Sequence, residues 1–171
     1  MLALHTGQRQ GDLLAMPWSS YDGHDIKLKQ SKTGARIRLP ATSTLKAALD
    51  AAPRVAGVIL TTRDGQPYTA DGFRSSWRKA CIKAGIKGVT FHDLRGTAVT
   101  RLFIAGCTDG EVATITGHSL TEVKSILDSN YFSRDYAMAE SGIAKLEATM
   151  NIPKRAPKRG DGSDVSEGIS Q

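Results

Sequence analysis

Two short runs of alternating apolar and polar residues constrain the fold of this 171-residue chain most strongly. Residues 25–30 and 35–39 carry apolar side chains at alternate positions, the pattern of a β-strand with one buried face. The link Ser31–Gly34 lies between them, and a glycine-containing link of this length is typical of a β-hairpin. Pro40 closes the second run. The sequence therefore predicts one small antiparallel sheet.

Most of the remaining sequence has helical character, with one short strand at most over residues 58–60. The fold class expected is mixed α/β, mostly α with a small antiparallel β-sheet. Trp18, Phe73 and Trp77 are expected to be core residues. Caps, apolar spacing and proline or glycine stops predict helices over residues 11–18, 42–52, 68–85, 91–105, 108–117, around 126–127 and over 134–150.

Length and composition predict a single domain over residues 1–150 and a disordered polar tail over residues 151–171. No apolar run approaches the roughly 18 residues of a membrane span, and the first residues lack the apolar stretch of a signal peptide. Cys81 and Cys107 are far apart and have no nearby metal-ligating partner in the sequence. A cytoplasmic, reduced protein is expected.

The overall charge favours a polyanionic partner. The net charge is +6 and the isoelectric point is about 9.5. Each Lys or Arg that neutralises a phosphate releases a counterion, so basic domains bind nucleic acids favourably. Charge alone is a weak indication, because many basic proteins never touch nucleic acid.

Four separated segments carry polar residues suited to phosphate chemistry. Taken singly, each has an ordinary interpretation, such as a solvated arginine, a charge at a hairpin tip, a surface pair, a histidine at a helix end or a core tyrosine. These interpretations do not account for the order in which the segments occur. The segments are Thr6–Leu13 with Arg9, Ser31–Arg36 with Lys32, Phe91–Ala98 with His92 and Arg95, and Thr116–Ser119 with His118, followed by Tyr131.

In this order the segments resemble the tyrosine recombinase (phage integrase) family, whose catalytic set is Arg, Lys, His-x-x-Arg, Gly-His and Tyr. The resemblance covers about Leu4 to Leu146. The gap between the last histidine and Tyr131 is longer than in many relatives, but residues 126–131 resemble the Ile-Leu-Asp-x-x-Tyr version of some integrases. Tyr136 is the second candidate for the nucleophile. The resemblance implies a catalytic set of Arg9, Lys32, His92, Arg95, His118 and the nucleophile Tyr131.

The chemistry of the two arginines agrees with this implication. Attack on a phosphodiester builds negative charge on the non-bridging oxygens of the transition state, and a guanidinium can donate paired hydrogen bonds to them. Arg9 and Arg95 are the candidates for this electrostatic stabilisation. His92 and Arg95 are three positions apart, so a helix directs both toward one face.

The remaining candidates would move protons and carry the covalent link. Lys32 can protonate the departing 5′ oxygen, which is the role the family gives this lysine. The phenol of Tyr131 is un-ionised at neutral pH, so it needs positive surroundings or a base, and His92 or His118 is placed to assist. The product would be a 3′-phosphotyrosyl link. No metal and no other cofactor is expected, because the arginines supply the charge neutralisation.

The resemblance implies double-stranded DNA as the substrate and other recombinase protomers on DNA as partners, with no membrane and no small-molecule substrate. It also implies site-specific recombination that integrates or excises a prophage or another mobile element. Relatives carry an N-terminal DNA-binding domain before the Thr6–Arg9 motif, so an N-terminally truncated catalytic domain is expected. Two alternatives remain, a cleavage-incompetent DNA-binding fragment and a type IB topoisomerase that relaxes supercoils.

Overall fold

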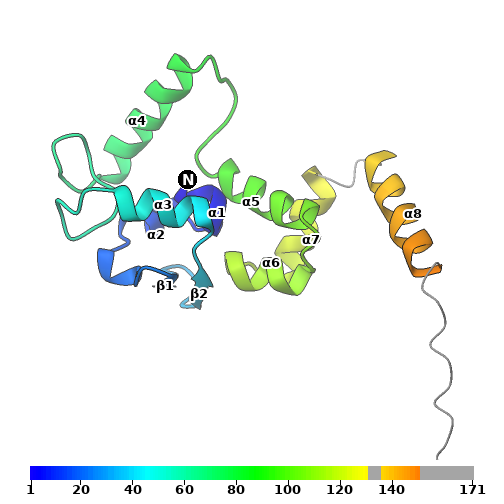
Figure 1. Ribbon diagram of the computed structural model, residues 1–171. Helices are drawn as coiled ribbons and strands as arrows, with labels where there is room; N and C mark the ends of the chain where they lie inside the picture. The colour runs from blue at the N-terminus through cyan, green and yellow to red at the C-terminus, as the bar shows by residue number, and fades with distance from the viewer. Residues whose placement is uncertain (131–135, 151–171) are drawn as a thin grey trace, which may run out of the picture. The chain divides into compact units, whose positions relative to one another are not determined.

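The computed structural model describes residues 1–130 and 136–150. It confirms the predicted fold class, a mostly helical chain with one two-stranded antiparallel sheet (Figure 1). A single turn of 3₁₀ helix, Trp18–Ser20, leads into the sheet. The helices are α1 (Leu2–Thr6), α2 (Gln10–Leu14), α3 (Ser43–Ala51), α4 (Ala70–Lys83), α5 (Asp93–Ile104), α6 (Asp109–Thr116), α7 (Leu120–Asn130) and α8 (Tyr136–Met150), and the strands are β1 (Asp25–Lys29) and β2 (Arg36–Pro40).

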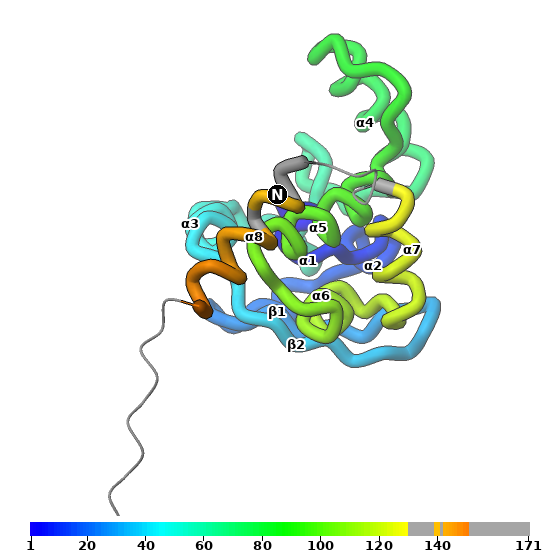
Figure 2. The backbone as a smooth tube through the Cα atoms, turned by 90° about the vertical axis from the view of Figure 1, so that its right-hand side faces the viewer, coloured from blue at the N-terminus to red at the C-terminus, as the bar shows by residue number. Residues whose placement is uncertain are grey.

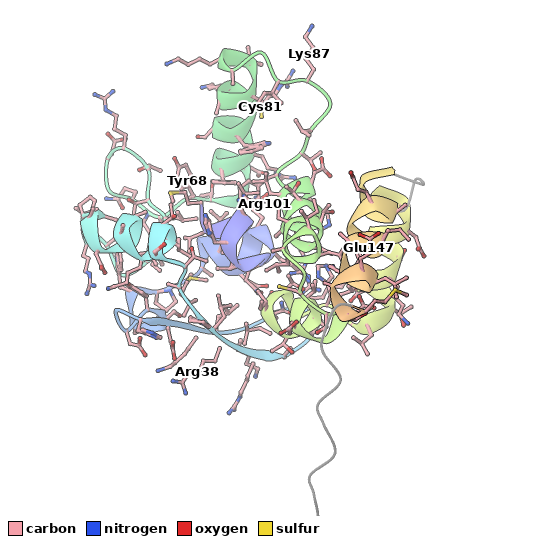
Figure 3. All side chains as sticks on the ribbon, turned by 45° about the vertical axis from the view of Figure 1, so that its right-hand side comes forward. Arg38, Tyr68, Cys81, Lys87, Arg101 and Glu147 are labelled. Atoms are coloured by element: carbon pink, nitrogen blue, oxygen red, sulfur yellow. The ribbon has the colours of Figure 1, made fainter. Side chains whose placement is uncertain are left out.

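The predicted hairpin is confirmed. In the register of the two strands, Ile26 lies opposite Leu39 and Leu28 lies opposite Ile37. These residues face the core, which also holds Trp18 as predicted. The alternate positions face solvent, and Figure 3 shows Arg38 directed away from the sheet. Strand β2 also contacts α6, as Figure 2 illustrates, so the sheet lies close to the turn that follows this helix.

Helix α5 is the element on which the site depends, because it contacts α1, α6 and α7 (Figure 1). Val99 of α5 is fully buried and forms a cluster with Val112, Val123 and Leu127 of the next two helices. Burial of each such side chain contributes about 1.5–3 kcal/mol. This packing brings the start of α5 close to the end of α1 and the end of α6.

The prediction of Phe73 and Trp77 as core residues is wrong, because both are only half-buried and α4 has no buried residue. Both rings instead pack edge to face on Phe91, with centroid distances of 4.8 and 5.2 Å. Helix α4 projects away from the rest of this part of the chain (Figure 1). Figure 3 shows Cys81 on this helix and Lys87 in the segment beyond it.

Helix α1 is not predicted from the sequence. Its five residues are too few to show helical periodicity, and it forms because Leu2 and Ala3 are buried in the core. Gly7 ends the helix with a left-handed φ of 62°, a conformation that glycine adopts without a steric penalty. The position of Arg9 therefore follows from a turn and not from a long helix.

The chain divides into two compact units, Met1–Ser133 and Arg134–Gln171, and α8 belongs to the second. The candidate site described below lies in the first unit. Residues 151–171 lie outside the described residues, so the predicted disordered tail and the domain boundary at residue 150 stay predictions. None of the helices that the structure describes is both long enough and apolar enough to span a membrane.

Candidate active site

Arg95 lies in the first turn of α5 and is only 3% exposed. Its Nη1 donates to the carbonyl oxygen of Thr116 at 2.7 Å and to that of Gly7. Its Nη2 is buried and has no partner among the described residues. A buried donor without an acceptor is costly, and the oxygens of a carboxylate or a phosphate are the acceptors to which a guanidinium donates its strongest hydrogen bonds.

Two guanidinium groups lie within electrostatic reach of each other. Burial, and after it the positive charge of Arg9, lowers the pKa of Arg95 to about 10, while Glu122 and Asp12 oppose this shift. Neither arginine forms an ion pair with a carboxylate among the described residues. Two positive charges without a paired carboxylate favour the binding of an anion.

Arg9 is placed by the turn between α1 and α2. It occupies the N-cap position of α2 in an extended conformation, two residues after Gly7. A Cβ atom on Gly7 would lie only 2.6 Å from Cγ2 of Thr116, so this close approach also requires glycine. The Nη1 of Arg9 donates to Oε1 of Gln30 at 2.9 Å. The turn thus directs Arg9 toward the end of strand β1.

His118 directly follows Gly117, which ends α6 with a φ of 66°. Its Nδ1 lies 2.8 Å from Oγ1 of Thr116, and that hydroxyl donates its own proton to the carbonyl oxygen of Val112 at 2.7 Å. The hydroxyl must therefore accept from Nδ1, so Nδ1 carries the proton and Nε2 carries a lone pair. Burial, followed by the positive charge of Arg95, lowers the pKa of His118 to about 4. His118 is consequently neutral at pH 7.

His92 occupies the N-cap position of α5 and is exposed. Its backbone is helical, with φ −63° and ψ −32°, and it lines one cavity of about 420 Å³ together with Arg95, as expected for two residues three positions apart. Among the described residues, no group of three or more His, Cys, Asp or Glu side chains is arranged to hold a metal ion. The lining residues are His92, Asp93, Arg95, Gly96, Thr97, Thr100, His118 and Ile126.

Lys32 lies in the hairpin turn, exposed and without a partner among the described residues. Its loop is fixed at two points. Oγ1 of Thr33 donates to Oε1 of Gln30 at 2.8 Å, and the backbone N–H of Ser31 donates to Oδ1 of Asp12 at 2.9 Å. Lys32 does not line the cavity, but its loop is hydrogen-bonded to the residue that holds Arg9.

The two tyrosine candidates have no described side chains. Tyr131 lies outside the described residues, and Tyr136 is the first residue of α8, with a side chain that is also outside them. The structure thus brings together four of the predicted site residues, since the pKa of His118 responds to the charges of Arg95, Arg9 and His92. The nucleophile stays a prediction.

The site contains three buried polar residues that the sequence patterns do not predict. Gln8, Gln30 and Thr116 are each at most 1% exposed, and hydrogen bonds join them to one another and to the arginines. Each lies within two residues of a predicted site residue, which is the one signal that could have found them. Apolar periodicity does not detect such residues, because their burial depends on partners distant in the chain.

The neutral state of buried His118 makes stability depend on pH. An unfolded histidine titrates near its ordinary pKa of 6.5, whereas folding lowers the pKa of His118 to about 4. Between these values the unfolded chain binds a proton that the folded chain does not, so the free energy of unfolding falls as pH drops from 6.5 toward 4. We expect His118→Gln to reduce the slope of melting temperature against pH in this window. The exposed His24→Gln is the matched control, and equal slopes in all three proteins would contradict the prediction.

Comparison with known proteins identifies the family of this chain. The family model described as "Phage integrase family" matches residues 1–133. The chain therefore belongs to the phage integrase family, as the order of its motifs predicts.

Individual relatives agree with this assignment. The chain is 35% identical over 121 residues to the shufflon-specific DNA recombinase of Escherichia coli, a match that covers 68% of this chain and 30% of the relative. Among solved structures, the lambda integrase dimer bound to a COC′ core site has a TM-score of 0.66 and 28% identity, covering 78% of this chain and 42% of that one. The lambda integrase tetramer bound to a Holliday junction has a TM-score of 0.60 and 27% identity, covering 71% and 40%. The chain thus spans less than half the length of these relatives.

Proposed function

We propose that this chain supplies the catalytic site of a site-specific DNA recombinase, which cuts and rejoins strands through a covalent phosphotyrosine. The single observation that carries the proposal is the buried, unpartnered Nη2 of Arg95 in the cavity that it lines with a neutral His118. The carboxylate of Asp93 also lines this cavity, but it accepts a hydrogen bond from the backbone of Thr90. The site is suited to receive an anion and to accept a proton.

In the proposed reaction the phenol oxygen of Tyr131 attacks the scissile phosphorus, and the bond from phosphorus to the 5′ oxygen breaks. Arg9 and Arg95 bind the non-bridging oxygens as their charge increases. The phenol proton passes to a histidine, and Lys32 gives a proton to the departing 5′ oxygen. The products are a 3′-phosphotyrosyl link and a 5′ hydroxyl, and rejoining follows the same steps in reverse.

Of the two histidines, the hydrogen bonds favour His118 as the proton acceptor. Its Nδ1 donates to Thr116, which leaves the lone pair on Nε2 available. A base must be unprotonated before it acts, and His118 is neutral at pH 7. His92 is exposed at the helix N-terminus and is the alternative.

We propose double-stranded DNA as the substrate and other copies of the recombinase as partners. Support comes from relatives crystallised as a dimer on core-site DNA and as a tetramer on a Holliday junction. The biological outcome proposed is integration or excision of a prophage or another mobile element.

Covalent trapping tests the proposal. The chain is incubated with a pool of duplexes that carry a nick and randomised flanking sequence, so that cleavage beside the nick releases a short strand and prevents rejoining. We expect an adduct that survives denaturation and can be sequenced to identify the preferred site. DNA binding without any adduct would overturn the recombinase proposal in favour of a DNA-binding fragment, and relaxation of supercoiled plasmid without preference for a site would favour the topoisomerase alternative.

Binding to duplex DNA is expected to weaken steeply with salt. Each phosphate contact made by a Lys or Arg contributes about −0.9 to the slope of log K against log salt, so contacts by Arg9, Arg95 and Lys32 predict a slope near −3 or steeper. Lys32→Ala should reduce the slope by about 1. The control Lys46→Ala removes an exposed lysine that already pairs with Asp50, and it should leave the slope nearly unchanged. A flat salt response of the unsubstituted chain would contradict a DNA partner.

A further inference from the structure

Gln30 follows strand β1, and its side chain is completely buried. All four hydrogen-bonding positions of its carboxamide are used. Oε1 accepts from Nη1 of Arg9 at 2.9 Å and from Oγ1 of Thr33 at 2.8 Å. Nε2 donates to Oε1 of Gln8 at 2.7 Å and to the carbonyl oxygen of Thr116 at 3.0 Å. A buried amide with every donor and acceptor satisfied is held in one orientation.

We propose that Gln30 is a positioning residue for strand cleavage, which holds the guanidinium of Arg9 at the site and couples it to the loop of Lys32 and to Arg95. The inference rests on the proposed function, because it assigns Gln30 to the reaction proposed above. Three contacts carry it, to Arg9, to Thr33 beside Lys32, and to the carbonyl of Thr116.

The coupling between the two arginines runs through one carbonyl group. The oxygen of Thr116 accepts from Nε2 of Gln30 at 3.0 Å and from Nη1 of Arg95 at 2.7 Å. Arg9, Gln30, Thr116 and Arg95 therefore form one continuous hydrogen-bonded chain across the end of α6. A shift of the amide moves Arg9 directly, and it also alters the group that fixes Arg95.

The neighbouring hydrogen bonds determine which end of the amide faces Arg9. Nε2 of Gln8 donates to the carbonyl oxygens of Thr6 and Ile115, each at 3.0 Å, so Oε1 of Gln8 is an acceptor. Gln30 must then present its nitrogen to Gln8 and its oxygen to Arg9. A carboxylate at position 30 cannot make the two donations, and an apolar side chain can make none of the four bonds.

Neutrality is the second reason why glutamine suits this position. A carboxylate beside Arg9 would form an ion pair and take up the positive charge that the scissile phosphate requires. An amide oxygen orients the guanidinium but leaves its full charge available. Gln30→Glu is therefore expected to keep Arg9 ordered and still slow the cleavage of a charged phosphate.

Gly117 packs closely against the side-chain amide of Gln30. A Cβ atom at this position would lie 2.3 Å from Nε2 of Gln30 and 2.7 Å from its Cδ, and the φ of 66° favours glycine independently. The backbone that precedes His118 therefore packs directly on the plane of the amide. A side chain at position 117 would therefore displace the amide from its contacts with Arg9 and Thr116.

Cleavage kinetics on two substrates test the inference. The first substrate is a nicked duplex with the preferred sequence identified by covalent trapping. The second is the same duplex with a methylphosphonate at the scissile position, which removes one negative charge. We expect Gln30→Met to slow single-turnover cleavage of the phosphate substrate by about 10- to 100-fold and to change the Kd for DNA by less than about threefold. On the neutral substrate the defect should shrink to about threefold or less, because less charge must be neutralised. An equal defect on both substrates would indicate a purely structural role and would overturn the inference.

A double variant, one control and a replacement substitution complete this test. Because Gln30 acts through Arg9 as well as through the carbonyl group that fixes Arg95, the variant with both Arg9→Ala and Gln30→Met should be slowed by clearly less than the product of the two single defects. Multiplied defects would contradict the inference. Gln66→Met removes an exposed glutamine and should cleave normally. If Gln30→Met does not fold, Gln30→Asn takes its place, because it keeps a neutral carboxamide but is one methylene shorter.

A measurement without cleavage separates failure of this inference from failure of the proposed function. In NMR spectra of the chain without DNA, the guanidinium signals of Arg9, assigned by their loss in Arg9→Lys, should exchange slowly with water. In Gln30→Met they should exchange rapidly. Unchanged Arg9 signals would refute the positioning role whether or not the chain forms an adduct with DNA. Slow exchange together with no adduct would instead keep the role of Gln30 in holding Arg9 and reject the recombinase chemistry.

Discussion

The Tyr131→Phe variant is expected to lose the covalent adduct with nicked DNA completely, which means a decrease in cleavage rate of about 10⁴-fold or more. Phenylalanine keeps the aromatic ring but has no oxygen to attack the phosphorus. DNA affinity should stay within about threefold of the unsubstituted chain, because the substitution removes no positive charge. The measurements are gel detection of the denatured adduct and fluorescence anisotropy with duplex DNA.

Tyr136→Phe is the matched control, since it removes the hydroxyl of the second candidate five positions further along the chain. This variant should form the adduct at a rate close to that of the unsubstituted chain. If Tyr136→Phe abolishes the adduct and Tyr131→Phe does not, Tyr136 is the nucleophile.

The Arg95→Met variant is expected to reduce the cleavage rate by about 10²- to 10³-fold, the usual effect of removing one stabilising donor from a charged transition state. The change should leave the melting temperature within a few degrees. It removes two hydrogen bonds to carbonyl oxygens, but it also removes a buried charge that has no described ion-pair partner. Activity and stability should therefore respond very differently.

Arg101→Met is the control for Arg95→Met, because Arg101 is an exposed arginine on the same helix. It should cleave at the normal rate. Arg95→Lys tests geometry separately from charge, since a lysine cannot donate the paired hydrogen bonds of a guanidinium. Normal cleavage by either Arg95 variant would contradict the proposed role of this residue.

Local rules predict much of the fold correctly. The alternation in residues 25–30 and 35–39 predicts both strands, which the structure places within one residue of those bounds. The capping box of Thr108 and Glu111 is present, with mutual hydrogen bonds between the two residues. These features succeed because strand alternation and helix caps depend on residues close together in the sequence.

The errors occur where distant contacts decide the outcome. The spacing of Phe73 and Trp77 correctly predicts a helix, yet their burial depends on Phe91, which belongs to a later segment. Helix α1 is too short to be predicted and is stabilised by residues that arrive much later in the chain. Apolar periodicity therefore identifies the elements better than it identifies the core.

The sequence likewise predicts the candidate site only in part. The motif predicts Arg9 and Arg95, but it does not predict that Arg95 is nearly inaccessible or that both arginines are linked through Gln30 and Thr116. Such a network joins four segments that are far apart in the sequence, and hydrogen-bond geometry is visible only once they have folded together.

The most direct test of the central claim is to identify the atoms that join protein to DNA. The trapped adduct is digested with nuclease and protease, and the modified peptide is sequenced by mass spectrometry. We predict one nucleotide joined through its 3′ phosphate to Tyr131, together with a released strand that ends in a 5′ hydroxyl. Attachment through a 5′ phosphate, or to a residue other than a tyrosine, would contradict the phosphotyrosine mechanism.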